Sequence, residues 1–345
     1  MIQSWAARVL ALTDLLRRSG VLWVGLLLLV GVALVALKSG AVPVSWPDYV
    51  ALLFQADAAD DFQRSVVFQL RLPRILFAIA AGGALALSGA AMQALFRNPL
   101  AEPGLIGLSA GAALGVVLCL LMGQTRLWQT GLAGFAGALL ATLAAYQFGK
   151  RYPGVAGLLL AGIAINAFAM SLVGLVISFS SDAQLRSFSF WSLGSLARAN
   201  WTGVSWLLPW TLLWSVYLCR QWRVLNALLL GEREAHHLGF DLARVRRSMV
   251  TAIAMLVGPL VAVTGGIAFV GLVVPHVLRL WRGADHRLLL PLSWLGGAVA
   301  LLLADWVARL AIVPAELPVG VITSLVGGPF FLWLLARASR VRPLA

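Results

Sequence analysis

Long apolar stretches alternate with short charged connections along this 345-residue chain. A helix needs about 20 mostly apolar residues to cross a bilayer. The pattern therefore predicts an all-α, polytopic membrane protein with about ten transmembrane helices in a single domain. The predicted spans are 21–37, 75–95, 105–122, 127–148, 155–179, 204–218, 249–263, 267–280, 288–304 and 319–335.

Region 249–280 admits two interpretations. Two spans of about 15 residues each are shorter than a bilayer usually requires, and one long helix is the alternative. The pair Gly265-Gly266 supplies a break at which the chain can turn back. Two spans place most of the 26 Lys and Arg residues on the cytoplasmic side, whereas one span divides them evenly between the two sides. The charge rule therefore favours two spans, with both termini in the cytoplasm.

Composition excludes several other classes of protein. A chain that is 61% apolar and 11% charged has too little polar surface for a soluble globule of this length. The net charge of +13 comes from Lys and Arg in short loops rather than on one face, which argues against nucleic acid as a partner. Phosphate-loop and His-Glu-x-x-His motifs are missing from the sequence, so the chain is not expected to be an enzyme.

One stretch, 226–247, is helix-compatible but far too polar to enter a bilayer. It predicts a cytoplasmic loop with two short helices, Glu232–His237 and Leu242–Arg247, separated by a turn at Leu238–Asp241. Asp241 has the residue type and position of an N-cap for the second helix. A solvated basic loop that only sets the topology is the alternative interpretation.

Several motifs in order along the chain carry a resemblance to a known family. They are Arg71–Arg74, Asn98–Gly104, Glu234–Gly239, Phe269–His276 and Glu316–Gly320. With these motifs the chain resembles the membrane-spanning permease subunit of type II ABC importers, the family that imports iron siderophores, haem and vitamin B12. Among these it looks most like the haem importers, because of the stretch Phe190–Leu196.

The resemblance implies a set of partners and a location. It implies a homodimer in the bacterial inner membrane, with two ABC ATPase subunits on the cytoplasmic side and a periplasmic substrate-binding protein on the other. No permanently bound cofactor is expected, and ATP is used by the partner subunit. ATPase coupling is expected at Glu232, Glu234, Ala235, Leu238, Gly239 and Phe240 in the loop 226–247.

The resemblance also implies roles for three further groups of residues. A cytoplasmic gate is expected at Asn98, Leu100, Val155 and Ala156, although a rigid proline turn explains the first pair equally well. Docking of the binding protein is expected at Arg71, Arg74 and Arg309, for which anchoring at span ends or pairing of Arg309 with Asp305 is the alternative. The expected pathway lining is Asn166, Ser171, Ser178, Phe188, Phe190 and Trp191.

The cargo follows less directly from the residues. The three aromatic residues of 188–191 can stack on a flat cargo or belong to an interfacial aromatic belt. All four histidines fall in cytoplasmic loops or in the cytoplasmic half of a span, so an axial ligand in the outer pathway would have to be Met or Tyr. No metal ligand is expected there, because a transporter must release its cargo. The sequence favours haem, with a ferric siderophore or vitamin B12 as alternatives.

A transporter of another class, driven by an ion gradient, needs carboxylates inside the membrane. Asp305 is the one carboxylate near the interior of a predicted span, and Arg309 lies one helical turn later. A pair at this spacing neutralises the carboxylate. The sequence therefore argues against ion coupling.

Overall fold

The computed structural model describes residues 2–341 except 41, 43, 46–47, 50–60, 153 and 314, and describes only the backbone of residues 2–19, 335 and 337–341. This part of the chain is helical, and its one extended pairing is an isolated bridge between Ile312 and Ala315. The predicted all-α fold is confirmed.

Helices occupy every predicted span. In chain order they are α1 Ile2–Lys38, α3 Asp61–Ser65, η1 Val66–Arg71, α4 Leu72–Leu95, η2 Pro103–Ile106, α5 Leu108–Leu121, α6 Leu127–Gly149, α7 Ala156–Ser178, α8 Asp182–Ser192, α9 Trp201–Arg220, α10 Trp222–Leu230, α11 Glu232–His237, α12 Leu242–Thr264, α13 Val270–Arg282, α14 His286–Leu310 and α15 Val319–Val341. By length and composition, 6 described helices can cross a membrane, while α5 and Val319–Leu334 are apolar but shorter. The expected number of about ten is therefore approximate.

Three helix boundaries differ from the prediction, each for a local reason. The helix that holds the predicted span 75–95 already begins at Asp61, because α3 and the π-helical turn η1 lead directly into α4. The expected short helix over 242–247 is the start of α12, and Gly107, with a φ of +88°, divides η2 from α5.

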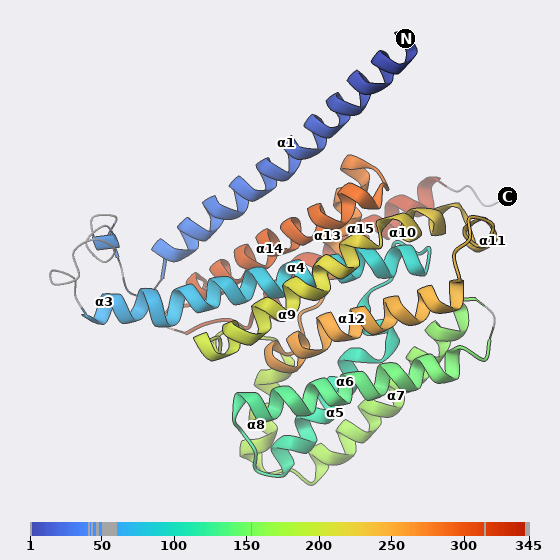
Figure 1. Cartoon of the computed structure of the whole chain (residues 1–345). Helices are drawn as coiled ribbons and strands as arrows, with labels where there is room; N and C mark the ends of the chain where they lie inside the picture. Colours follow the sequence, from blue (N-terminus) through green and yellow to red (C-terminus); the bar gives the residue numbers. More distant parts are fainter. Residues whose placement is uncertain are drawn as a thin grey trace.

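The helices form a bundle whose centre is α4 (Figure 1). Most of α4 is buried, because its many Ala and Gly residues let α14, α13, α9 and α12 pack closely around it. In Figure 1, α5, α6 and α7 lie together on one side of α12, and α4, α14 and α13 lie on the other side. The first turns of α1 and the last turns of α15 lie at the same end of the bundle as α11.

Backbone approaches at glycines explain this tight packing. A Cβ atom added to Gly82 would lie 2.2 Å from the carbonyl oxygen of Gly297, and one added to Gly89 would lie 1.7 Å from that of Gly271. A Cβ added to Gly111 on α5 would lie 2.3 Å from the carbonyl oxygen of Gly137 on α6. Small residues at these positions thus bring helix backbones together.

Three connections meet through their main chains at the end of the bundle opposite α11. The α12–α13 connection passes so close to the α8–α9 connection that a Cβ on Gly194 would lie 2.2 Å from the carbonyl oxygen of Gly266. A Cβ added to Gly320, at the start of α15, would lie 2.3 Å from the same oxygen. The backbone N–H of Ser195 donates to the Thr264 carbonyl at 2.8 Å, and that of Gly320 donates to the Gly194 carbonyl at 3.3 Å.

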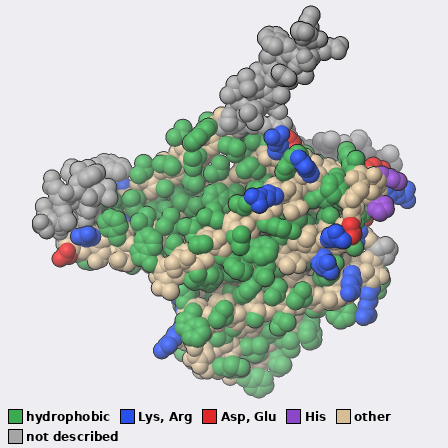
Figure 2. Space-filling model, in the orientation of Figure 1, with side chains coloured by type: hydrophobic (Ala, Val, Ile, Leu, Met, Phe, Trp, Pro, Cys, Tyr) green, Lys and Arg blue, Asp and Glu red, His purple; other side chains and the backbone are tan. Residues whose placement is uncertain are grey.

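Charged and hydrophobic side chains are distributed unevenly along the bundle. In Figure 2 the middle of the visible face is covered by hydrophobic side chains, and most Lys and Arg side chains gather toward the end that carries α11. Exposed apolar side chains such as Leu140, Leu160 and Leu213 are more than three-fifths exposed on helices of this central band. Such a band is the surface that a bilayer would solvate.

Candidate functional site

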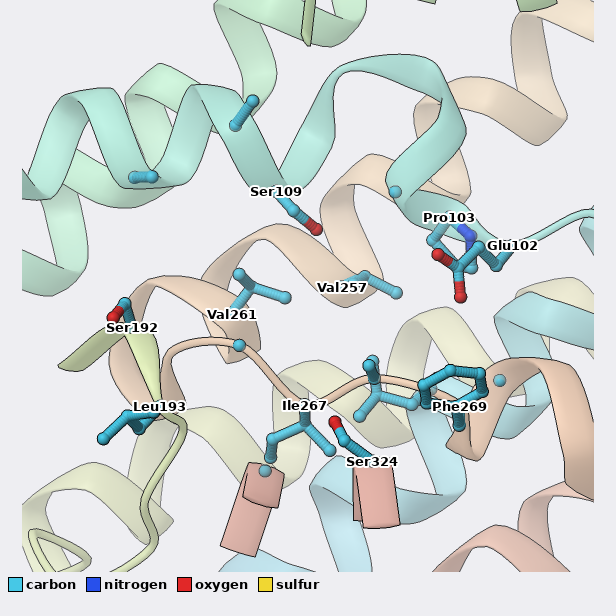
Figure 3. Close-up of a pocket in the computed structure, with 18 of the residues that line it drawn as sticks. Glu102, Pro103, Ser109, Ser192, Leu193, Val257, Val261, Ile267, Phe269 and Ser324 are labelled. Carbon is cyan, nitrogen blue, oxygen red and sulfur yellow. The ribbon is translucent and has the colours of Figure 1, made fainter. Parts of the chain in front are cut away.

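A cavity of about 970 Å³ lies between the two halves of the bundle (Figure 3). It reaches the upper end of the size range of small-molecule sites, roughly 300–1,000 Å³. Most of its wall is apolar. The lining comes from Leu85, Glu102, Pro103, Gly104, Leu105, Ser109, Ala110, Ala113, Asn166, Met170, Phe188, Trp191, Ser192, Leu193, Val257, Val261, Gly266, Ile267, Ala268, Phe269, Gly271, Gly320, Val321, Ser324 and Leu325.

Few polar groups face this cavity. The Asn166 amide lines it and donates to the Gly104 carbonyl at 2.9 Å, which ties α7 to η2. Figure 3 shows the Glu102 carboxylate and the Ser109 hydroxyl directed into the cavity. Burial raises the pKa of the Glu102 carboxyl. Glu102 is not among the expected pathway residues, because the spacing of residues does not show which way a loop side chain points.

Ser171 and Ser178, the other polar residues expected in the pathway, do not line the cavity. The Ser171 hydroxyl donates to the Ala167 carbonyl at 2.9 Å, and that of Ser178 donates to the Leu175 carbonyl at 2.7 Å. Each hydroxyl is thus satisfied within its own helix, which lowers the cost of its position in an apolar surface. Their role in the pathway stays a prediction.

The short helix α8 brings two of its aromatic residues to the cavity. Phe188 and Trp191 stack with ring centroids 5.7 Å apart, and the Trp191 indole N–H donates to the Ala262 carbonyl at 3.0 Å. Phe190 points elsewhere, because it is 67% exposed and does not line the cavity. The Gln184 amide fixes α8 to the end of α5 by donating to the Leu120 carbonyl at 3.0 Å.

Phe269 forms part of the cavity wall in an unusual conformation. Its φ of +67° is rare for an aromatic residue and marks local strain. The side chain is packed against α15, where a Cβ added to Gly327 would lie 2.2 Å from that of Phe269. The sequence does not indicate this conformation, because a left-handed backbone is expected mainly at Gly, Asn or Asp.

The segment 231–246 forms a compact projection, which we call the coupling knob. Leu238 is 61% exposed on it, whereas Ala235 is fully buried against the core. The reversal after α11 is closed by the Phe240 N–H, which donates to the Ala235 carbonyl at 3.1 Å, with Gly239 at a φ of +89°. The knob borders a groove of about 480 Å³, lined by His236, Gly239, Phe240, Asp241, Leu242, Ala243 and Arg246.

Ionic and capping contacts hold the coupling knob in place. Arg246 forms an ion pair with Glu232 at 3.2 Å, which joins α11 to α12. The same guanidinium donates to the Gly154 carbonyl at 3.3 Å and so reaches the α6–α7 connection. Asp241 caps α12, as predicted, by accepting from the N–H groups of Ala243 and Arg244. Glu234 is exposed on the surface of α11.

The four expected gate residues lie on two connections near the α11 end. The Asn98 carboxamide accepts from the Leu100 N–H at 2.9 Å and thus stabilises the turn after α4. Val155 is the residue before α7 and packs partly against the core, while Ala156 is exposed. None of the four lines the cavity. A gate formed by these residues stays a prediction.

The three arginines expected to receive a binding protein have internal partners. Arg71 is 5% exposed and donates to the carbonyls of Leu37 at 2.8 Å and Lys38 at 3.1 Å, at the end of α1. Arg309 is 8% exposed and donates to the Ala36 carbonyl at 3.2 Å. Arg71 and Arg309 are therefore buried beneath the end of α1, and docking of a binding protein at these residues stays a prediction.

The remaining arginine of this group belongs to a buried ionic cluster. Arg74 contacts Asp305 at 2.9 Å and Glu316 at 2.7 Å, and Arg309 contacts Asp305 at 3.2 Å. Asp305 is fully buried between the two cations. The predicted pairing of Asp305 with Arg309 is therefore present, and Asp305 is not available as an ion-coupling carboxylate. Only Glu316, with 40% of its side chain exposed, brings this cluster to the surface.

Comparison with known proteins identifies the family. The model of the FecCD transport family matches residues 27–337. This chain belongs to that family. It is 47% identical over 276 residues to proteins named vitamin B12 import system permease protein BtuC from Salmonella typhimurium (strain LT2) and from Salmonella typhi, over 79% of this chain and 84% of theirs.

Solved structures agree with this assignment. A metal-chelate type ABC transporter, described in an inward-facing conformation, is 35% identical and superposes with a TM-score of 0.84 over 92% of this chain and 99% of that one. PsaBC from Streptococcus pneumoniae, at 17% identity and a TM-score of 0.58, shares the fold. This FecCD family member is a permease subunit of a bacterial ABC importer, as the motifs predicted.

Proposed function

We propose that this chain carries vitamin B12, or a related bulky metal chelate, from a periplasmic binding protein to the cytoplasm. The 47% identity to permeases named for vitamin B12 supports this cargo over the haem that the sequence favoured. The cavity is compatible with it. A mostly apolar wall with a few polar groups suits a large macrocycle with polar substituents.

Haem is retained as the second candidate because of one observation. The stacked pair Phe188 and Trp191 offers an aromatic face at the cavity wall, which a flat macrocycle can contact. Either cargo is expected to be held by shape and polar contacts, which permits its release.

Energy for transport is supplied, in this proposal, by two copies of a separate ATPase subunit that bind the coupling knob. Leu238 is the exposed apolar side chain of the knob, and the adjacent groove offers a recess for a partner. The ion pair of Glu232 with Arg246 would pass a displacement of α11 on to α12, which lines the cavity through Val257 and Val261.

The second permease subunit of the proposed homodimer would cover α7 and α15. In both helices large apolar residues are exposed, among them Phe168 and Met170 on α7 and Leu325 and Val326 on α15. Met170 and Leu325 also line the cavity, so a second copy there would complete its wall. Asn98 and Leu100 would then meet their counterparts near the two-fold axis at the cytoplasmic exit.

Uptake into proteoliposomes tests the cargo. The permease, its ATPase and its binding protein are reconstituted, and uptake of labelled cyanocobalamin and of haem is measured with ATP and with a non-hydrolysable analogue. ATP-dependent uptake of cyanocobalamin that excess unlabelled haem does not inhibit is expected. Uptake of haem alone would overturn the vitamin B12 assignment, and uptake of neither would leave the proposed cargo class without support.

Replacing Leu238 and Gly239 by aspartates tests the coupling knob. Leu238 is 61% exposed and a Cβ added to Gly239 meets nothing within 4 Å, but a side chain at a φ of +89° strains the backbone. Leu238→Asp alone is therefore measured beside the double variant, to separate lost docking from local distortion. The ATPase should no longer co-purify, while the variant remains monodisperse in detergent. The matched control is Arg233→Asp, an exposed change on the same helix that spares Leu238. Full co-purification of the double variant would refute the proposed docking.

A further inference from the structure

Four arginines and two tryptophans lie where α13 ends and α14 begins, beside α10, which packs against α14. We call this group, together with the adjacent histidines, the arginine corner. In Figure 1 the junction of α13 and α14 lies toward the end of the bundle that carries α11. The members of the arginine corner are Trp222, Arg223, His276, Arg279, Trp281, Arg282, His286 and Arg287.

Arg279 has guanidinium donors that lack hydrogen-bond acceptors. Its Nε and Nη2 atoms are shielded from solvent and have no hydrogen-bond partner among the described residues. It lies within electrostatic reach of His276, one turn earlier on the same helix face, and of His286. A shielded guanidinium without an acceptor costs free energy, so a further group that accepts its hydrogen bonds is expected there.

His286 points to the same missing group. It is fully buried, and its Nδ1 lies 2.9 Å from the Asn226 carboxamide oxygen. That oxygen can only accept, so Nδ1 carries the proton, and Nε2 is left as an acceptor without a partner among the described residues. Asn226 in turn donates to Asp285 at 2.8 Å, and Asp285 caps α14 through the Arg287 N–H at 3.0 Å. The arginine corner thus offers donors beside an acceptor.

The surroundings resemble a bilayer interface. Arg282 lies over the Trp281 ring at 5.3 Å, and Trp222 has Arg223 at 5.3 Å on the same indole that Arg287 approaches at 5.6 Å. Arginines paired with tryptophans are typical of the headgroup level.

Large apolar side chains lie next to these cations. Leu280 is 70% exposed, Trp281 is 63% exposed, and Leu230 at the end of α10 is 67% exposed. Acyl chains would cover such side chains. A free anion would leave them in water.

We propose that the arginine corner binds the headgroup of an anionic phospholipid of the cytoplasmic leaflet. Arg279, which is only partly buried, would donate to the phosphate of a headgroup such as that of phosphatidylglycerol. Basic pockets between helices on the cytoplasmic side have the charge and position for such headgroups. The apolar neighbours argue for a lipid rather than for free phosphate or an acidic side chain of another subunit.

Native mass spectrometry of the full chain in detergent tests this site. The protein is titrated with phosphatidylglycerol, with phosphatidylcholine of the same acyl chains, and with phosphatidylglycerol in the presence of inorganic phosphate. The wild type should bind one phosphatidylglycerol about five- to tenfold more tightly than phosphatidylcholine, since one well-placed arginine contributes about that factor near anionic lipid. Arg279→Gln should remove this preference, and Arg279→Lys should keep part of it.

Arg244→Gln is the matched control. Arg244 lies on the first turn of α12 toward the same end, is 78% exposed and faces Asp241 at 3.7 Å, so its replacement removes one cation without touching the arginine corner. Its lipid preference should equal that of the wild type. A second measurement compares the thermal stability of each variant in phosphatidylglycerol and in phosphatidylcholine nanodiscs, so that a less stable Arg279→Gln protein is judged against itself.

Three outcomes would overturn the proposal. An equal preference in the wild type and in Arg279→Gln would show that the unpartnered guanidinium is satisfied by water. Displacement of the lipid by inorganic phosphate would assign the site to a free anion. An equal loss of preference in Arg244→Gln would reduce the effect to general surface charge. If Arg279→Gln does not yield monodisperse protein, Arg279→Lys and Arg287→Gln carry the same comparison.

Discussion

Replacing Asp305 by asparagine is expected to destabilise the protein strongly. Asp305 is fully buried and is the carboxylate that Arg74 and Arg309 share at 2.9 Å and 3.2 Å. Removing one partner of a buried ion pair costs about 3–5 kcal/mol, because the remaining charge stays in a low-dielectric environment. Each kcal/mol corresponds to roughly 2 °C for a chain of this size, so the thermal midpoint should fall by about 5–10 °C.

The control is Glu316→Gln in the same ionic cluster. Glu316 also contacts Arg74, at 2.7 Å, but 40% of its side chain is exposed. An exposed ion pair contributes about 0–1 kcal/mol, so this variant should lose no more than about 2 °C. The midpoints are measured as the monodisperse fraction after heating in one detergent. Equal shifts for Asp305→Asn and Glu316→Gln would refute the reasoning that burial makes this carboxylate indispensable.

Further predictions concern a helix contact and a loop carboxyl. Gly89→Ala should abolish stable expression, since its Cβ would lie 1.7 Å from the Gly271 carbonyl oxygen, whereas Gly174→Ala, with nothing within 4 Å, should leave the thermal midpoint unchanged or slightly raised. Equal expression of the two variants would contradict this. Because burial raises the pKa of Glu102, the folded chain keeps that proton to a higher pH than the unfolded chain. Stability should therefore fall as pH rises from the ordinary value of 4.5 through the raised pKa, and Glu102→Gln should lack that fall in a pH series of thermal midpoints.

The sequence predicted the parts of the fold that depend on local pattern. Apolar runs located the helices of 127–149 and 156–178 to within a residue, and Gly265-Gly266 marked the break between α12 and α13. Motifs in order along the chain were sufficient for the family. These features are encoded by neighbouring residues, so they are visible without knowledge of tertiary contacts.

The orientation and burial of several side chains could not be predicted from the sequence, because they depend on contacts between residues far apart in the chain. Arg71 and Arg309 were interpreted as surface cations because both adjoin the ends of predicted spans. Whether a guanidinium there meets solvent or the last carbonyls of α1 depends on how α1 lies over α4 and α14. Glu102 and Phe269 were missed as cavity residues for the same reason, since a loop side chain is aimed by its backbone rather than by its spacing.

The meeting of Gly194, Gly266 and Gly320 constrains how this sequence can vary. Each of these residues excludes a Cβ because another main chain occupies the space, and the chain that excludes it is more than 50 positions away in each case. A change at one of the three positions cannot be compensated by a smaller neighbour, since the neighbour is already backbone. Relatives that keep this contact should therefore retain all three glycines together. In a relative that has lost one of them, a whole connection at the end of the bundle opposite the coupling knob should follow a different path.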